Sequence, residues 1–148
     1  MRISIGADHK GVDHKKAICE LLESKGITVY DEGPYTYDSV DYPDYAKVVA
    51  GKVSKKEVDF GILICYTGIG MSMAANKVKG VRASLVGLLE DAVLTREHND
   101  SNVLCLSAKN TSIEDTLKIV DVYLNTAFTA GRHTARVDKV MKLENEER

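Results

Sequence analysis

The sequence has no excess of basic residues and no apolar segment long enough to cross a bilayer. Its 148 residues include 20 Lys and Arg and 22 Asp and Glu, which gives a formal net charge of −2. A chain so balanced lacks the polybasic field that drives binding to nucleic acid, so any anion site must be local. A membrane-spanning helix needs about 20 apolar residues in succession, and no such run is present. We therefore expect neither a nucleic-acid partner nor a membrane partner.

Cysteine is scarce, and its spacing matches neither a disulfide framework nor a zinc-binding motif. Cys19, Cys65 and Cys105 are odd in number and far apart, and no Cys-x-x-Cys occurs. This pattern argues against disulfides and against a structural zinc site, so we expect reduced thiols. Cys19 and Cys105 lie inside apolar patterns and are expected in the core. The first residues enter a strand-like run, Arg2 to Ala7, without the apolar stretch of a signal peptide, and we expect a cytoplasmic protein.

Internal repeats, linkers and low-complexity tracts are also absent from the sequence. With 44% hydrophobic residues, the chain can bury a core as a single domain, 1–148, without disulfides or a metal. Strand-like runs alternate with helical patterns five times, and a further helix follows from about Gly131. This order predicts an α/β fold of three layers, α/β/α, with a doubly wound five-stranded parallel sheet and a C-terminal helix.

The expected strands are short apolar runs: Arg2 to Ala7, Ile27 to Asp31, Phe60 to Ile64, Val81 to Val86 and Val103 to Leu106. Helical spacing and terminal residues predict helices that stop at Gly26, open at Pro43, end at Gly80 and run from Leu89 to His98. Thr111 and Glu114 have capping-box spacing before the next helix. The longest irregular segment, Glu32 to Asp44, is polar and rich in tyrosine, and it is a candidate cover for a site.

The stretch from Asp59 to Asn76 has the pattern of a buried strand, a glycine-spaced turn and a helix. Such a turn leaves backbone N–H groups at a helix start, where they can bind an anion or a developing oxyanion at the carboxyl end of the sheet. Cys65 stands at the end of the strand, where a helix N-terminus favours its thiolate. This stretch can therefore supply both a base or nucleophile and its oxyanion partner.

Three familiar site types do not fit this stretch. Gly68-x-Gly70 begins like a dinucleotide fingerprint, but Met73 replaces the third glycine. No Gly-Lys-Ser/Thr occurs, which excludes a nucleoside-triphosphate P-loop. A cysteine phosphatase would need an arginine six positions after its nucleophile, where this chain has Met71. A buried strand-end cysteine is the plain alternative for Cys65, and the glycine turn favours the functional interpretation.

The other candidate residues also have plain alternatives. His9 and His98 lie at junctions between strands and helices, although a lone histidine is more often exposed or simply hydrogen-bonded. Arg132 and Arg136 are four residues apart and so share a helix face, which is either solvated or able to hold a phosphate bidentately. We expect no metal site, because no pair has a metal-binding spacing among the candidates Asp8, His9, Cys65 and His98.

Several motifs occur in the order found in one enzyme family. They are Gly6-x-Asp8-His9-x-Gly11, Asp41-Tyr42-Pro43, Gly61-Ile62-Leu63-Ile64-Cys65-x-Thr67-Gly68-x-Gly70, Ala74-Ala75-Asn76-Lys77, Arg96-x-His98-Asn99-Asp100-x-Asn102 and Gly131-Arg132-His133-x-x-Arg136. Nearly end to end, the chain resembles the type B ribose-5-phosphate isomerases and the wider family that also holds allose-6-phosphate isomerases and galactose-6-phosphate isomerase subunits. The motifs together are much more specific than any one alone.

The resemblance implies interconversion of ribose 5-phosphate and ribulose 5-phosphate without a metal or other cofactor. It also implies a Rossmann-like homodimer, alone or paired into a tetramer, with active sites at the subunit interface. Cys65 matches the base that moves a proton between C2 and C1 through a cis-enediol, and Thr67 matches the hydroxyl that assists transfer between the oxygens. The enediolate would be stabilised by the amides of the turn: Gly68, Ile69, Gly70, Met71 and Ser72.

The resemblance assigns the remaining residues to the substrate. Asp8 and His98 match the groups that bind and open the furanose ring, and Asn99 matches a ligand of the sugar hydroxyls. The matches to phosphate ligands are His9, Arg132 and Arg136.

Two positions depart from the family pattern. Tyr66 follows the cysteine where relatives usually have glycine, so its ring either enters and narrows the pocket or turns outward. Lys109 stands where many relatives have an arginine that reaches the partner subunit's phosphate, and a lysine keeps the charge but loses the bidentate fork. Two alternatives stay open: an isomerase of allose or galactose 6-phosphate, and a sugar-phosphate-binding protein that has lost turnover because Tyr66 blocks the pocket.

Overall fold

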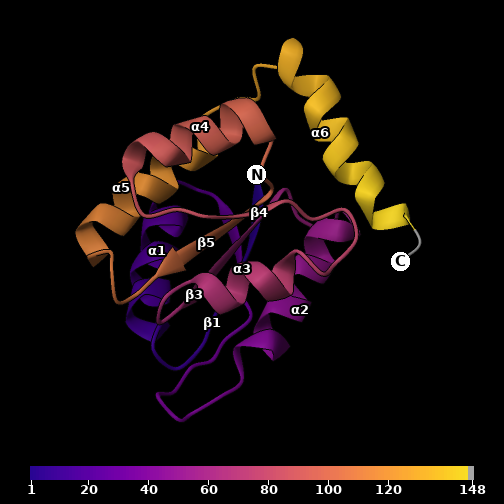
Figure 1. Cartoon of the computed structure of the whole chain (residues 1–148). Coiled ribbons are helices and arrows are strands. Elements are labelled where there is room, and N and C mark those ends of the chain that lie inside the picture. The colour runs from indigo at the N-terminus through magenta and orange to yellow at the C-terminus, as the bar shows by residue number, and fades with distance from the viewer. Residues whose placement is uncertain (147–148) are drawn as a thin grey trace.

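A sheet of five parallel strands forms the centre of the molecule (Figure 1). The computed structural model describes residues 1–146. In spatial order the strands are β2 (Thr28–Asp31), β1 (Arg2–Ala7), β3 (Phe60–Cys65), β5 (Val103–Ser107) and β4 (Ala83–Leu85). Each neighbouring pair is parallel. The predicted α/β fold with a five-stranded parallel sheet is confirmed.

Helices cover both faces of the sheet and enclose two cores. One face is covered by α1 (Val12–Ser24), α4 (Leu89–Asn99) and α5 (Ile113–Leu124). The other face is covered by α2 (Tyr42–Ser54) and α3 (Ile69–Ala75). Successive residues of a strand point to opposite faces, so Ile62 and Ile64 enter the first core while Leu63 and Cys65 enter the second. Cover on both faces explains why β3 is a continuous apolar run.

Helix α3 is shorter than the sequence predicts. It ends at Ala75 rather than Gly80, because the side chain of Asn76 connects it to the next strand. Asn76 Nδ2 donates to the Ser72 carbonyl at 3.0 Å, and its Oδ1 accepts from the Ala83 N–H at 2.9 Å. These bonds turn the chain toward β4 directly after the helix.

The starts of β4 and α5 also differ from the prediction. The Arg82 N–H bonds to Asn102 Oδ1 at 2.7 Å, and β4 begins only after it. Helix α5 is capped by Ser112, whose Oγ accepts from the backbone N–H of Asp115 at 3.1 Å. The predicted cap, Thr111, has a buried hydroxyl without a hydrogen-bond partner in residues 1–146. The capping pattern is therefore present one residue later than expected.

Helix α6 (Arg132–Lys142) stands apart from both covering layers (Figure 1). None of its residues is buried, and Val140 on it is 55% exposed. It contacts the rest of the chain through a stack of His133 on His98 and through a bond from Arg82 Nη1 to Met141 Sδ of 3.3 Å. Neither α6 nor any other helix within residues 1–146 is long and apolar enough to cross a membrane.

Candidate active site

The carboxyl ends of β1 and β3 lie side by side, and a predicted site residue stands at each. Ala7 pairs with Ile64 in the parallel register, and the Asp8 N–H donates to the Ile64 carbonyl at 3.0 Å. Asp8 is therefore next to Cys65, the last residue of β3. The strand order reverses between β1 and β3, and ligands of open α/β sheets bind outside the carboxyl ends at such a switch point.

The Cys65 thiol is held by the turn that follows it. The Gly68 N–H donates to Cys65 Sγ at 3.2 Å, so a thiolate here would accept a hydrogen bond from the backbone. Gly68 has a φ of +78°, and a Cβ on it would lie 2.4 Å from Leu85 Cδ1 and 2.9 Å from the Leu106 carbonyl oxygen. The turn therefore requires glycine for both its backbone conformation and its close packing.

Two amides of the turn have no hydrogen-bond partner in the described residues. Besides the amide that bonds to the sulfur, the Ile69 N–H donates to Thr67 Oγ1 at 3.3 Å and the Ser72 N–H donates to a carbonyl of the turn at 3.1 Å. Within residues 1–146, no hydrogen bond uses the N–H of Gly70 or Met71. Of the five amides predicted to stabilise the enediolate, these two are without a partner in the described residues, and both are at the start of α3.

Tyr42 lies against the same turn and is absent from the predicted site residues. A Cβ on Gly70 would lie 2.5 Å from the Tyr42 Cζ, so the glycine is needed for the ring to approach. Tyr42 opens α2 beside Pro43 and is 38% exposed. Tyr42 belongs to the Asp41-Tyr42-Pro43 motif, and this motif could have identified it as a site residue.

The irregular segment before α2, a predicted candidate cover for a site, lies beside this end of the sheet. His9 Nδ1 accepts a hydrogen bond from the Val40 N–H at 3.3 Å. The Tyr35 hydroxyl donates to the Asp31 carbonyl, and the Tyr37 hydroxyl donates to a carboxylate of α1, each at 2.6 Å. These contacts fasten the tyrosine-rich segment next to His9.

Four other predicted residues, His98, Asn99, Arg132 and Arg136, belong to a second cluster at the opposite end of the sheet, whereas Lys109 follows β5 at the carboxyl end. Helix α4 starts after the carboxyl end of β4 and runs back, so His98 and Asn99 precede the amino end of β5. The rings of His98 and His133 stack at 4.2 Å with a 15° interplanar angle. Together with Asn99 and Arg136 they line a cavity of about 440 Å³. One protomer therefore does not bring His98 to Cys65.

Charge is concentrated around this second cluster. Arg132 and Arg136 are both exposed on the first turns of α6. Desolvation in the stack, and then repulsion from His98 and the two arginines, lowers the pKa of His133 below its usual value. Two stacked imidazoles beside two guanidiniums favour an anionic ligand. His133 was not predicted as a site residue, although it lies within the Gly131-Arg132-His133 motif.

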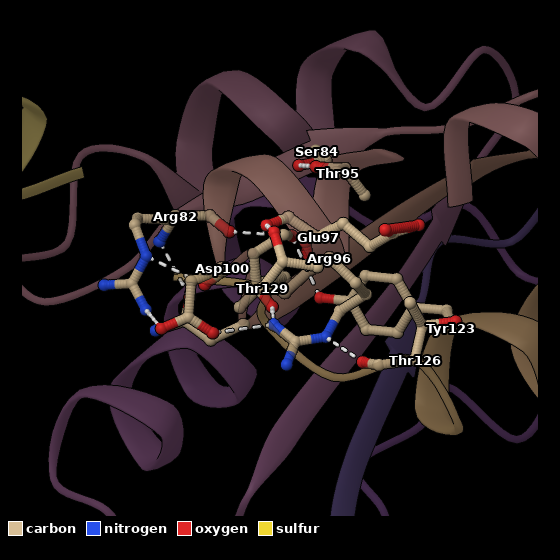
Figure 2. A network of polar contacts seen from close by, with 12 residues as sticks. Arg82, Ser84, Thr95, Arg96, Glu97, Asp100, Tyr123, Thr126 and Thr129 are labelled. Atoms are coloured by element: carbon tan, nitrogen blue, oxygen red, sulfur yellow. Dashed lines mark hydrogen bonds and ion pairs between the residues drawn. The ribbon is translucent and has the colours of Figure 1, made fainter. Parts of the chain in front are cut away.

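A buried arginine holds the end of α4 that carries His98. Arg96 is 7% exposed and donates from Nη1 to Asp100 Oδ1 at 2.9 Å and to the Ser101 carbonyl at 2.6 Å, and from Nε to the Thr126 carbonyl at 3.1 Å. Figure 2 shows the Asp100 carboxylate between the guanidiniums of Arg96 and Arg82. These residues flank the His98-Asn99 pair in the sequence, so the network holds the backbone on either side of it.

We expect Arg96→Ala to lower the free energy of unfolding by about 3 kcal/mol, because it removes a buried charge from its partners and leaves carbonyls unpaired. Urea denaturation measures the change. The matched control is Lys118→Ala, which breaks an exposed pair with Glu114 (3.6 Å) and should cost less than about 0.5 kcal/mol. Equal losses in the two variants would contradict an anchoring role for Arg96.

Sequence comparison places these residues in a known group of proteins. The model of the ribose/galactose isomerase family matches residues 3–140. The chain belongs to that family. Among relatives, the probable ribose-5-phosphate isomerase B of Mycoplasma genitalium is 49% identical, with 97% of this chain and 96% of the relative covered. The ribose-5-phosphate isomerase B of Escherichia coli is 41% identical over 97% of this chain and 96% of its own.

Solved structures of the ribose/galactose isomerase family agree over nearly the whole chain. Ribose-5-phosphate isomerase B of Clostridium thermocellum matches with a TM-score of 0.96 at 43% identity, covering 98% of each chain. The Mycoplasma genitalium enzyme with bound ribulose 5-phosphate matches with a TM-score of 0.96 at 48% identity, covering 99% of this chain and 97% of the other. The suspected family resemblance is thus confirmed.

Proposed function

We infer that this chain is an aldose–ketose isomerase that interconverts ribose 5-phosphate and ribulose 5-phosphate. The observation that carries this inference is the near-complete structural match to a family member that holds ribulose 5-phosphate. The local chemistry agrees, because proton abstraction next to a carbonyl needs a positioned base and donors for the resulting oxyanion. Cys65 and the free amides of Gly70 and Met71 are suited to these two tasks.

In the proposed mechanism the Cys65 thiolate removes the proton from C2 of the open-chain aldose and returns it to C1 of the cis-enediol. Thr67 passes a proton between O1 and O2 through its hydroxyl. The Gly70 and Met71 amides stabilise the enediolate oxygen, and phosphate binding at a distance holds the reacting carbons in place. Asp8 opens the furanose ring together with His98.

We propose a homodimer in which each active site combines residues of two subunits. The support is geometric: Cys65 and His98 lie at opposite ends of the sheet within one protomer. Helix α6 has no buried residue and presents Val140 to solvent, as expected of an element that packs on a second copy. One subunit then supplies Asp8, His9 and Cys65, while its partner supplies the ligands His98, Asn99, Arg132 and Arg136.

We further propose that residues 1–148 form one sugar-phosphate isomerase domain that acts in the cytoplasm. The three cysteines are free, and reduced thiols suit a reducing compartment. A thiolate base in particular would be lost on oxidation.

The function is tested by incubating the purified protein with ribose 5-phosphate and, separately, with allose 6-phosphate and galactose 6-phosphate, in the presence of a chelator. We expect ketose formation from ribose 5-phosphate with the highest kcat/KM. Faster turnover of a hexose 6-phosphate would reassign the substrate within the same reaction. Binding without turnover of any of the three would overturn the enzyme assignment in favour of a sugar-phosphate sensor.

Alkylation distinguishes the three cysteines, all of which are buried. Burial, and then the nearby Asp31 carboxylate, raises the pKa of Cys19 to about 11, and burial raises the pKa of Cys105. Both stay protonated near neutral pH and react slowly. We expect iodoacetamide to modify Cys65 first, with ribose 5-phosphate protecting it, as followed by peptide mass spectrometry. Preferential labelling of Cys19 or Cys105 would contradict this assignment.

A further inference from the structure

A lysine on α1 is fully buried beside the carboxyl end of β2. Lys15 is 1% exposed, and its Nζ donates to both carboxylate oxygens of Asp31, at 2.8 Å to Oδ1 and at 2.7 Å to Oδ2. Lysine is almost never fully buried unless it is paired. A buried ion pair is weak evidence for stability, because desolvation of the two charges offsets much of their attraction. The groups that the pair holds in place are therefore its more informative feature.

Asp31 fixes the start of the irregular segment that follows β2, residues 32–41. Its Oδ1 also accepts from the Gly33 N–H at 2.9 Å, and its backbone carbonyl accepts from the Tyr35 hydroxyl at 2.6 Å. The Tyr35 ring lies beside the buried ammonium group, with Lys15 Nζ 5.3 Å from the ring centroid. The ion pair thus anchors the segment at its start.

The middle of the segment is held on the first turns of α1. The Tyr37 hydroxyl donates to Asp13 Oδ1 at 2.6 Å, and Lys16 Nζ lies 5.3 Å from the centroid of the Tyr37 ring. Helix α1 begins at Val12, three residues after His9. The segment and His9 are therefore held by the same end of one helix.

The far end of the segment contacts the His9 ring. The Val40 N–H donates to His9 Nδ1 at 3.3 Å. An N–H group can only donate, so Nδ1 accepts and the hydrogen of the neutral imidazole lies on Nε2. Within residues 1–146, the only hydrogen bond to the His9 ring is the one at Nδ1, so Nε2 is available to donate to a ligand.

We propose that Lys15 and Asp31 are positioning residues of the active site. Their ion pair anchors the segment 32–41, whose Val40 amide keeps His9 in the tautomer that donates from Nε2 to the substrate phosphate. This proposal rests on the proposed function and adds to it two residues that touch no substrate. Without the pair the start of the segment is released, and His9 then samples both tautomers, of which only one donates from Nε2.

The double change Lys15→Met/Asp31→Leu separates positioning from stability. Apolar side chains of similar size often replace a buried ion pair without loss, so we expect the urea midpoint to stay within about 0.5 M of the parent. KM for ribose 5-phosphate should rise about fivefold while kcat stays within about twofold, because phosphate binding is weakened and the base is unaffected. The matched control, Lys25→Met/Asp121→Leu, removes a partly exposed pair at the other end of α1 and should leave KM unchanged.

The tautomer of His9 is measured by two-bond ¹H–¹⁵N correlation spectra of the imidazole rings at about pH 8, where histidine is mostly neutral. We expect a single tautomer with the hydrogen on Nε2 in the parent protein and a mixture in the double variant. His14 is an internal control, because its Nε2 donates to the Thr111 carbonyl at 2.8 Å, and its signals should not change. A purely structural role for the pair would leave the His9 signals in place as well.

The contact between Val40 and His9 is tested by a matched pair of changes. Val40→Pro removes the N–H that reaches the ring, whereas Val40→Ala keeps it. We expect Val40→Pro to raise KM about fivefold and Val40→Ala to leave it unchanged. In the Val40→Pro background the double change should add less than about twofold, because the contact through which it acts is already lost.

Each outcome supports or refutes the proposal. A folded Lys15→Met/Asp31→Leu protein with unchanged KM and an unchanged His9 tautomer would refute it, and so would a full effect in the Val40→Pro background. If the double variant does not fold, Lys15→Met takes its place, because the Asp31 side chain is 33% exposed and can then be solvated. Absence of turnover in the parent enzyme refutes the proposed function instead, and the His9 spectra still test the positioning.

Discussion

Cys65→Ala lowers kcat for ribose 5-phosphate isomerisation by at least about a hundredfold, while the affinity for inorganic phosphate is retained. The reason is that Cys65 is the proposed base, and the Gly68 N–H donates a hydrogen bond to its sulfur. The proposed phosphate ligands are other side chains, so ground-state binding should be untouched and the loss should appear in kcat. Initial-rate measurements check the loss of kcat, and titration with phosphate checks the retained affinity.

The matched control for this change is Cys19→Ala. Cys19 is also a buried thiol, but it lies on α1 in the core of the opposite face and has a pKa raised to about 11. Its removal should leave kcat within about twofold, since it contacts no proposed substrate group. Retention of more than a few per cent of kcat in Cys65→Ala would move the base to another residue.

Mixing two inactive variants restores activity if the site is shared between subunits. Cys65→Ala disables one half of the site, and the double change Arg132→Ala/Arg136→Ala disables the other half. After subunit exchange, half of the dimers are mixed, and each mixed dimer has one site with both halves intact. We therefore expect recovery of about a quarter of the parent kcat/KM.

The control pair places both defects in the same half of the site. Cys65→Ala mixed with Thr67→Ala leaves every site of the mixed dimer defective, so no activity should return. Arg132 and Arg136 are exposed, which makes their replacement compatible with folding. Absence of recovery in the test pair after verified exchange would place the whole site within one protomer. Recovery in the control pair would instead place Cys65 and Thr67 in different halves of the site.

Much of the fold was predictable because its signals are local. Apolar runs such as Phe60–Cys65 indicate covered strands, and Gly26 and Pro43 mark a helix end and a helix start wherever they occur. The end of α3 was predicted wrongly because a side-chain hydrogen bond to another element determines it. Asn76 ends α3 by bonding to the following strand, which helical spacing alone does not reveal.

The motifs that carry the predicted site residues can be recognised in the sequence, but the sequence does not show where the fold places them. The motif around His98 was noted at a junction between helix and strand, yet that junction is at the amino end of the sheet. The direction of α4 decides this, because a helix between parallel strands carries the chain back to where the next strand begins. His98 and Cys65, which we propose act in the same active site, are therefore far apart within one subunit.

By itself the sequence determined the family, the succession of strands and helices along the chain, and the thiol beside a glycine turn, because periodicity and motif spacing are properties of neighbouring residues. The tertiary structure alone decided which side chains meet. It separated Cys65 from His98, and it brought Lys10 and Lys109 to the ring of Tyr66. Contacts of this kind depend on strand order and helix direction, which join residues that are distant along the chain.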